Sequence, residues 1–200
     1  VRFDVAPPVY TVSFPLSNSY VREPTFSFDV NENLKEATLM WERTGGEADP
    51  GAPHPVSLSG AELTAGSHPD VSPTEAVNLV NGAVYSLSLK ATDLAGNAGE
   101  AVTVSGLTFD DIPPVLAVAS PVSASFTNNL RVSYTNSEVL ASGTVTWTQI
   151  GGAADGNSPH EIALTGDEFS AGEHADIELA SVASLQDGAV YDVAFQGGDA

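Results

Sequence analysis

The chain has 200 residues, a formal net charge of −20 at pH 7 and no cysteine. Six Lys and Arg residues stand against 26 Asp and Glu residues, so the protein would repel nucleic acid and anionic membranes, and we expect neither as a partner. Disulfides and thiolate metal sites are excluded. No apolar stretch is long enough for membrane insertion, and Val1 opens no charged and then apolar leader, so we expect any targeting signal to lie outside this sequence.

A long internal repeat organises the sequence. The two tryptophans, Trp41 and Trp147, are 106 positions apart, and the same offset relates the four histidines in two pairs. With this offset, 33 of 94 aligned positions are identical. A period of this length corresponds to one whole domain for each repeat. We therefore predict a first repeat over residues 1–108 and a second over residues 109–200.

Within each repeat, apolar and polar residues alternate with a period of two, which predicts half-buried β-strands. In the first repeat the predicted strands are Val9–Phe14, Thr25–Val30, Ala37–Glu42, Pro55–Ser59, Val84–Lys90 and Glu100–Ser105. In the second they are Leu130–Tyr134, Thr144–Thr148, Glu161–Thr165 and Val190–Phe195. A short helical turn could compete only over Ser72–Val80. Six or seven strands in about a hundred residues predict an all-β fold, with two antiparallel β-sandwiches in tandem and Greek-key connections.

The repeated aromatic residues are predicted to lie in the two cores. Trp41 and Trp147 fall in the middle of predicted strands, and Tyr85 and Tyr191 fall near the start of a late strand. Large aromatic side chains at such positions usually pack between sheets. We expect core packing here rather than stacking against a ligand.

Two segments near the predicted boundary carry a family resemblance. They are Ala91–Asn97 (Ala-Thr-Asp-Leu-Ala-Gly-Asn) and Phe109–Pro114 (Phe-Asp-Asp-Ile-Pro-Pro). Both resemble the bacterial immunoglobulin-like, cadherin-like repeats of large surface adhesins. The resemblance implies tandem immunoglobulin-like sandwiches that are secreted or displayed on the cell surface. It also implies a role as a stalk or adhesive module, with neighbouring repeats as partners and calcium as a stiffening ion.

The residues themselves make calcium plausible, because Ca²⁺ binds six to eight oxygen ligands on flexible loops. Oxygen-bearing side chains occur where the first repeat closes, where the second opens, and after the second predicted strand of each repeat: Asp93, Asn97, Asp110, Asp111, Glu32 and Glu138. We expect Asp93, Asn97, Asp110 and Asp111 to lie close together, with Glu32 or Glu138 beside them. The alternative is that Asp93 and Asn97 only shape a turn while the acidic pair is solvated.

Histidine and aspartate recur together in both repeats. The pattern Gly-Gly-x-Ala-Asp…His ends at His54 and again at His160, and His-x-Asp occurs at His68 and at His174. In the His-x-Asp pairs, imidazole and carboxylate oxygen could hold zinc if a third ligand joined them. For these pairs we favour repeated turn architecture, in which the histidine donates to a nearby carboxylate.

The sequence contains few features that would indicate an enzyme. It has no nucleophile-elbow serine, no glycine-rich phosphate loop after a strand and no HExxH helix, so we expect no catalytic activity. The main alternative to a spacer is a binding module, for example one accessory to a secreted enzyme. Under this hypothesis, a glycan or a cell-surface protein would bind to the loops that carry Asp49, His54, His68 and Asp70.

The second repeat is expected to be truncated. Its Ala200 aligns with Leu94, so it has no counterpart of Glu100–Ser105. Val190–Phe195 would then present unpaired backbone groups along an exposed edge. We expect this strand either to pair with another chain or to be less protected than Val84–Lys90. Lengthening the chain by about fifteen residues should stabilise the repeat.

Overall fold

The computed structural model describes residues 3–179 and 184–199, and the chain divides into two compact units, residues 1–112 and 113–200. The predicted all-β class is confirmed. The described residues form strands and two short 3₁₀ turns, with no α-helix. Within the same ranges, no helix is long and apolar enough to cross a membrane.

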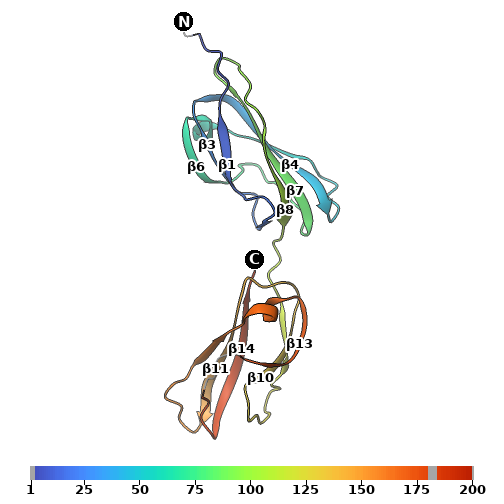
Figure 1. The fold of residues 1–200 in the computed structure, drawn as a ribbon, viewed down its shortest axis with the longest axis vertical. Helices are drawn as coiled ribbons and strands as arrows, with labels where there is room; N and C mark the ends of the chain where they lie inside the picture. The colour runs from blue at the N-terminus through green and yellow to red at the C-terminus, as the bar shows by residue number, and fades with distance from the viewer. Residues whose placement is uncertain (1–2, 180–183, 200) are drawn as a thin grey trace. The chain divides into compact units, whose positions relative to one another are not determined.

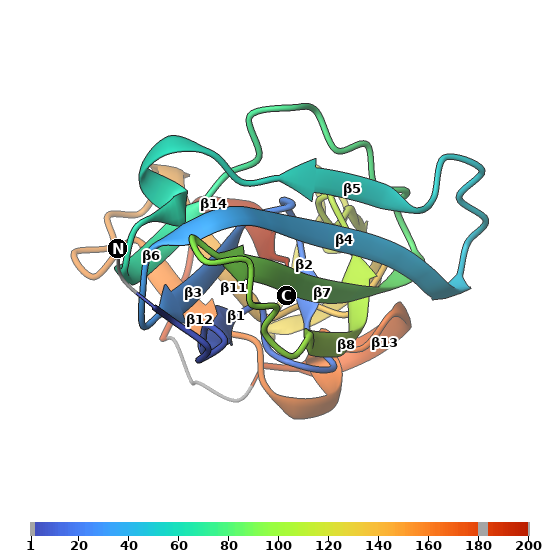
Figure 2. The ribbon, with the colours of Figure 1, turned by 90° about the horizontal axis from the view of Figure 1, so that it is seen from above.

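Unit 1 consists of a three-stranded and a five-stranded sheet (Figure 1). The smaller sheet has the order β1-β3-β6, with β1 at Tyr10–Phe14, β3 at Phe26–Val30 and β6 at Gly66–Val71. The larger sheet has the order β2-β8-β7-β4-β5, with β2 at Tyr20–Val21, β8 at Val102–Phe109, β7 at Ala83–Asp93, β4 at Leu34–Gly46 and β5 at His54–Ser57. Figure 2 shows β5, β4, β7 and β8 side by side. The pairing is antiparallel except for β2 with β8, which is parallel.

Unit 2 follows the same plan with fewer strands. One sheet has the order β13-β10-β9, with β9 at Leu116–Ser120, β10 at Arg131–Asn136 and β13 at Gly172–Glu178. The other has the order β12-β11-β14, with β11 at Ser142–Gly152, β12 at His160–Ala163 and β14 at Ala189–Gly198. Every one of these strands begins within two residues of the position 106 beyond its counterpart. In the described residues of unit 2, β2 and β8 have no counterpart.

Each unit has its own hydrophobic core between its sheets. In unit 1, Phe26 and Phe28 of the small sheet and Leu87 and Trp41 of the large one belong to one hydrophobic cluster, and all four are fully buried. Trp41 and Trp147 are 0% and 2% exposed, which confirms that the repeat offset relates equivalent core positions.

Ser72–Val80, the segment where a short helical turn could compete, has no helical structure. The helical turns lie instead at Gly60–Leu63 and Gly166–Phe169. In the first of them, the Glu62 carboxylate accepts the backbone N–H of Ser59 at 2.8 Å. This capping box satisfies backbone groups that the start of a helical turn leaves unpaired.

Candidate metal centre

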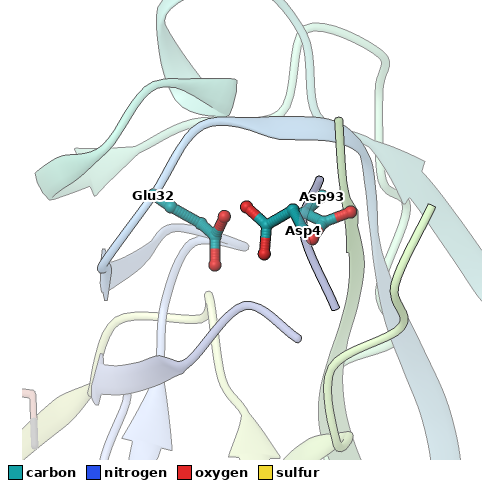
Figure 3. Close-up of side chains that lie close together, drawn as sticks. All are labelled: Asp4, Glu32 and Asp93. Atoms are coloured by element: carbon teal, nitrogen blue, oxygen red, sulfur yellow. The ribbon is translucent and has the colours of Figure 1, made fainter. Parts of the chain in front are cut away.

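Three carboxylates meet at one end of unit 1 (Figure 3). Asp4 precedes β1, Glu32 lies between β3 and β4, and Asp93 is the last residue of β7. One carboxylate oxygen from each residue lies within 4.8 Å of the other two. Calcium binds oxygen at about 2.3–2.6 Å, so ligands on opposite sides of one ion are about 4.6–5.2 Å apart. The three oxygens are therefore spaced to share a single cation.

Asp93 is held in place by the turn that follows β7. Its Oδ1 accepts the backbone N–H groups of Ala95 and Asn97, each at 2.8 Å, and its Oδ2 accepts the side-chain N–H of Asn97 at 2.7 Å. Gly96 completes the turn with a φ of +91°, a conformation that favours glycine. Burial acts to raise the pKa of Asp93, but these hydrogen bonds outweigh it and hold the pKa below its usual value. The carboxylate is therefore ionised at neutral pH.

Asn97 also fixes the N-terminal segment beside this turn. Its side-chain nitrogen donates to the carbonyl oxygens of Asp4, at 3.2 Å, and of Ala6, at 3.4 Å. An amide nitrogen has no lone pair to offer a cation. In this orientation Asn97 positions Asp4 beside Asp93.

The structure does not bring Asp93 and Asn97 together with Asp110 and Asp111, so the expected convergence of these four residues is wrong. Strands β7 and β8 are antiparallel, with Val84 opposite Thr108. Asp93 at the end of β7 and Asp110 just after β8 consequently lie at opposite ends of unit 1.

The remaining expected ligands are Asp110, Asp111 and Glu138. The backbone N–H of Asp110 donates to Val21 O at 3.0 Å, and that of Asp111 to Asn81 Oδ1 at 3.1 Å. Glu138 is half-buried just after β10. The sequence analysis did not predict Asp4 as a ligand. The repeat offset could have indicated it, because Asp4 is the equivalent of Asp110, which was predicted.

The residues of this cluster are acidic in both repeats, which distinguishes them from many other acidic residues of the chain. Residues 1–94 contain twelve acidic positions, and six of them are acidic and identical 106 positions later: Asp4, Glu32, Asp49, Glu62, Asp70 and Asp93. Local turn and loop roles account for part of this retention, since Asp49 accepts hydrogen bonds from His54 and Tyr85, Glu62 caps a 3₁₀ turn, and Asp70 has a left-handed φ of +49°. Asp93 shapes the turn after β7, and Asp4 Oδ1 accepts the backbone N–H of Ala6 at 3.2 Å. All three residues of the cluster are among the six retained positions.

A second polar network lies inside unit 1 near the start of β7. Asp49 Oδ2 accepts hydrogen bonds from His54 Nε2 and from the Tyr85 hydroxyl, both at 2.6 Å, and the hydroxyl accepts the backbone N–H of Val80 at 2.9 Å. Burial acts to raise the pKa of Asp49, but the hydrogen bonds from His54 and Tyr85 outweigh it and lower the pKa to about 2. Burial and the hydrogen bond to Asp49 raise the pKa of Tyr85 to about 12.

Unit 2 repeats this network. His160 Nε2 donates to Asp155 Oδ2 at 2.7 Å, and the Tyr191 hydroxyl donates to the same oxygen. The hydrogen bonds from His160 and Tyr191 lower the pKa of Asp155 to about 2. The sequence contains a signal for this Asp–His–Tyr network, because the Asp…His spacing and the later tyrosine recur at the same offset. The sequence predicts core positions for the two tyrosines but not the hydrogen-bond partners of their hydroxyl groups.

The His-x-Asp pairs act differently. His68 stacks on Phe28 with ring centroids 4.6 Å apart, and its Nε2 donates to Thr64 O at 2.8 Å. His174 stacks on Tyr134 in the same way, and its Nε2 donates to Ser170 O at 2.9 Å. Their hydrogen-bond partner is thus a backbone carbonyl rather than the expected carboxylate. Neither ring belongs to a group of three close metal-ligating side chains among the described residues.

The chain matches no protein-family model, and no curated protein matches it. The resemblance to bacterial immunoglobulin-like repeats therefore rests on the sequence motifs alone.

Proposed function

We propose that this chain is a segment of an extracellular, calcium-binding repeat array that acts as a spacer or stalk of a bacterial surface or secreted protein. Neighbouring repeats of the same protein are its main partners in this proposal. Calcium stiffens the chain by neutralising carboxylates that otherwise repel one another. We infer the immunoglobulin-like family from the sequence motifs.

The observation that carries the calcium part is the group formed by Asp4, Glu32 and Asp93. Three carboxylates with oxygens within 4.8 Å repel one another unless a cation lies between them. The turn around Asp93 supplies one of them ionised and fixed. The sequence repeats the same three residue types 106 positions later, as Asp110, Glu138 and Asp199.

A spacer is preferred to a glycan- or protein-binding module because three of the four candidate loop residues, Asp49, His54 and His68, are engaged internally, while Asp70 is exposed. The side chain of Asp49 is 2% exposed and is hydrogen-bonded to His54. The His68 ring stacks on Phe28. A shallow hollow over β4 and β7 is lined by Thr38, Met40, Glu42, Pro53, Ser88 and Lys90, with no aromatic side chain for a sugar ring.

Calorimetric titration of the 200-residue chain with CaCl₂ tests the proposal. We expect binding with a Kd of about 0.1–1 mM, the range typical of extracellular calcium modules. The informative variant is Glu32→Gln, which removes one carboxylate without touching the turn that depends on Asp93. We expect this variant to lose one bound ion or to bind it much more weakly.

Glu23→Gln is the matched control, because Glu23 is exposed and is not repeated in the second copy. It removes the same charge and should leave calcium binding unchanged. Equal weakening by both substitutions would mean that calcium is held only by the general negative charge. The absence of any binding heat at millimolar Ca²⁺ would refute the calcium part of the proposal.

A further inference from the structure

One dipeptide in unit 1 combines an electrophile with a nucleophile that can attack it. Asn81 and Gly82 form the one Asn-Gly pair in the sequence. The backbone nitrogen of a residue can attack the side-chain carbonyl carbon of a preceding asparagine through a five-membered ring, and proximity strongly favours such a reaction within one chain. Glycine has no Cβ to hinder the approach. The reactivity of the pair therefore depends on how the fold holds the two groups.

The turn before β7 holds this pair in an ordered conformation. Asn81 and Gly82 are the central residues of a β-turn that is closed by the backbone N–H of Ala83, which donates to Val80 O at 3.0 Å. Gly82 has a φ of +75°, a left-handed conformation that favours glycine at the third position of such a turn. Both residues are half-buried. The pair thus lies within the folded body of unit 1.

One segment, at the end of β8, holds both reacting groups. The backbone N–H of Gly82 donates to Phe109 O at 2.8 Å. The side-chain oxygen Oδ1 of Asn81 accepts the backbone N–H of Asp111 at 3.1 Å. The Gly82 nitrogen must give up its hydrogen bond before it can lose its proton and attack. Opening of the segment at residues 109–111 therefore frees the nucleophile and the electrophile together.

We propose that Asn81 is a site of spontaneous deamidation, and that the end of β8 sets the rate by covering the Gly82 nitrogen. When the hydrogen bond between Gly82 and Phe109 opens, the Gly82 nitrogen loses its proton to solvent base and bonds to Cγ of Asn81. The side-chain nitrogen takes a proton and leaves as ammonia, and a succinimide remains. Water then hydrolyses either carbonyl of the succinimide, which gives aspartate or isoaspartate. In sum, an amide and water become a carboxylic acid and ammonia, with no change of oxidation state.

The two products affect the turn differently. Aspartate is compatible with it, because unit 2 has Asp187 and Gly188 at the equivalent positions, with Gly188 at a φ of +76°. Isoaspartate instead inserts a side-chain carbon into the backbone path and lengthens it. Gly82 then cannot keep both its place in the turn and its hydrogen bond to Phe109. Formation of isoaspartate thus loosens the end of β8 permanently.

The test compares deamidation with hydrogen exchange at the same backbone nitrogen. The 200-residue chain and a free peptide of residues 77–86 are incubated at one mildly alkaline pH. Mass spectrometry of digests locates the product by the exchange of an amide for a carboxyl group. Exchange of the Gly82 N–H and deamidation of Asn81 both require the hydrogen bond to Phe109 to open. We expect the fold to slow the two reactions, relative to the peptide, by closely similar factors.

Phe109→Leu tests the control by β8, because Phe109 is buried at the last position of that strand. A smaller side chain weakens the packing of this end, and we expect both reactions to become about tenfold faster. Val102→Ala is the matched control, since Val102 is half-buried at the opposite end of β8. It should leave both rates unchanged. Asn81→Gln should abolish the reaction, because attack on its longer side chain needs a six-membered ring.

Three outcomes would overturn the proposal. One is the absence of product at Asn81 in a chain whose Gly82 N–H exchanges. Another is equal acceleration by Phe109→Leu and Val102→Ala, which would mean that the reaction needs unfolding of the whole unit. The third is that Phe109→Leu speeds the exchange of Gly82 and leaves deamidation as it was. None of these outcomes depends on calcium binding.

Discussion

The carboxylate of Asp49 joins the loop between β4 and β5 to the distant strand β7. It accepts hydrogen bonds from His54 at the start of β5 and from Tyr85 in β7, and it also accepts the backbone N–H of Gly51 at 2.9 Å. Hydrogen bonds to a charged group contribute more than neutral ones, particularly where little water competes. This one side chain therefore anchors the loop after β4 to the body of the sheet.

We predict that Asp49→Asn lowers the free energy of unfolding of unit 1 by about 1.5–3 kcal/mol at pH 7. The effect depends on pH because the folded-state pKa, about 2, lies below the ordinary value of 3.8. The contribution of Asp49 is complete above that ordinary value and is lost as the pH falls toward 2. Urea unfolding, followed by Trp41 fluorescence in a Trp147→Phe background, measures both effects. A difference between wild type and variant that did not shrink over this range would contradict the assignment.

Gly106 combines two constraints in β8. Its φ is +74°, and a Cβ built on it would lie 2.4 Å from Asn18 Oδ1. We predict that Gly106→Ala destabilises unit 1 by about 1–2 kcal/mol from the left-handed backbone alone, and by more because of the contact with Asn18. Gly60→Ala is the control, since Gly60 has a φ of +57° and nothing within 4 Å of its Cβ position. Equal losses of stability in urea unfolding would show that the contact with Asn18 has no effect.

At the scale of elements, β7 and β14 have closely similar lengths and equivalent positions but different neighbours. Strand β7 is bordered by β4 and β8, whereas β14 is bordered by β11 only within the described residues. Backbone protection depends on pairing and cover as well as on sequence. The different surroundings make the two strands an internal comparison of what one neighbouring strand contributes.

We predict faster amide exchange over Tyr191–Phe195 than over Tyr85–Leu89 in the 200-residue chain. The physical reason is that β14 pairs with β11 alone among the described residues and that its core face is half-buried. Residue-resolved hydrogen exchange measures the difference directly. Similar protection in a monomeric sample would mean that this difference in pairing has no cost in local stability.

For the whole molecule, the dominant quantity is the charge of −20. Repulsion among so many carboxylates opposes compaction, and salt screens it. Any cation therefore stabilises the protein to some extent. A specific calcium site predicts an additional effect at constant ionic strength.

We predict that calcium at about ten times its Kd stabilises unit 1 by about 1.4 kcal/mol, which raises its melting temperature by about 5–10 °C for a unit of this size. Calorimetric melts in CaCl₂ are compared with melts in NaCl at matched ionic strength. Glu32→Gln should abolish the calcium-specific part of the rise and leave the salt-dependent part. An equal rise in NaCl would indicate screening alone.

The sequence by itself determined the repeat, the all-β class and the burial of both tryptophans. These follow from periodicities along the chain, which need no knowledge of which strands are neighbours. It also found the oxygen-rich turn at Asp93 and Asn97. It did not find β6, whose residues Gly66–Val71 are mostly polar and show no clear alternation.

Only the tertiary structure decided which acidic residues meet. Asp93 and Asp110 are close to the predicted boundary in sequence, yet the antiparallel pairing of β7 with β8 separates them by the length of a strand. Asp4 and Glu32 come to Asp93 because the fold returns to that end of unit 1 from three different segments. Distance in space is set by strand order and direction, and neither is a property of any local stretch of sequence.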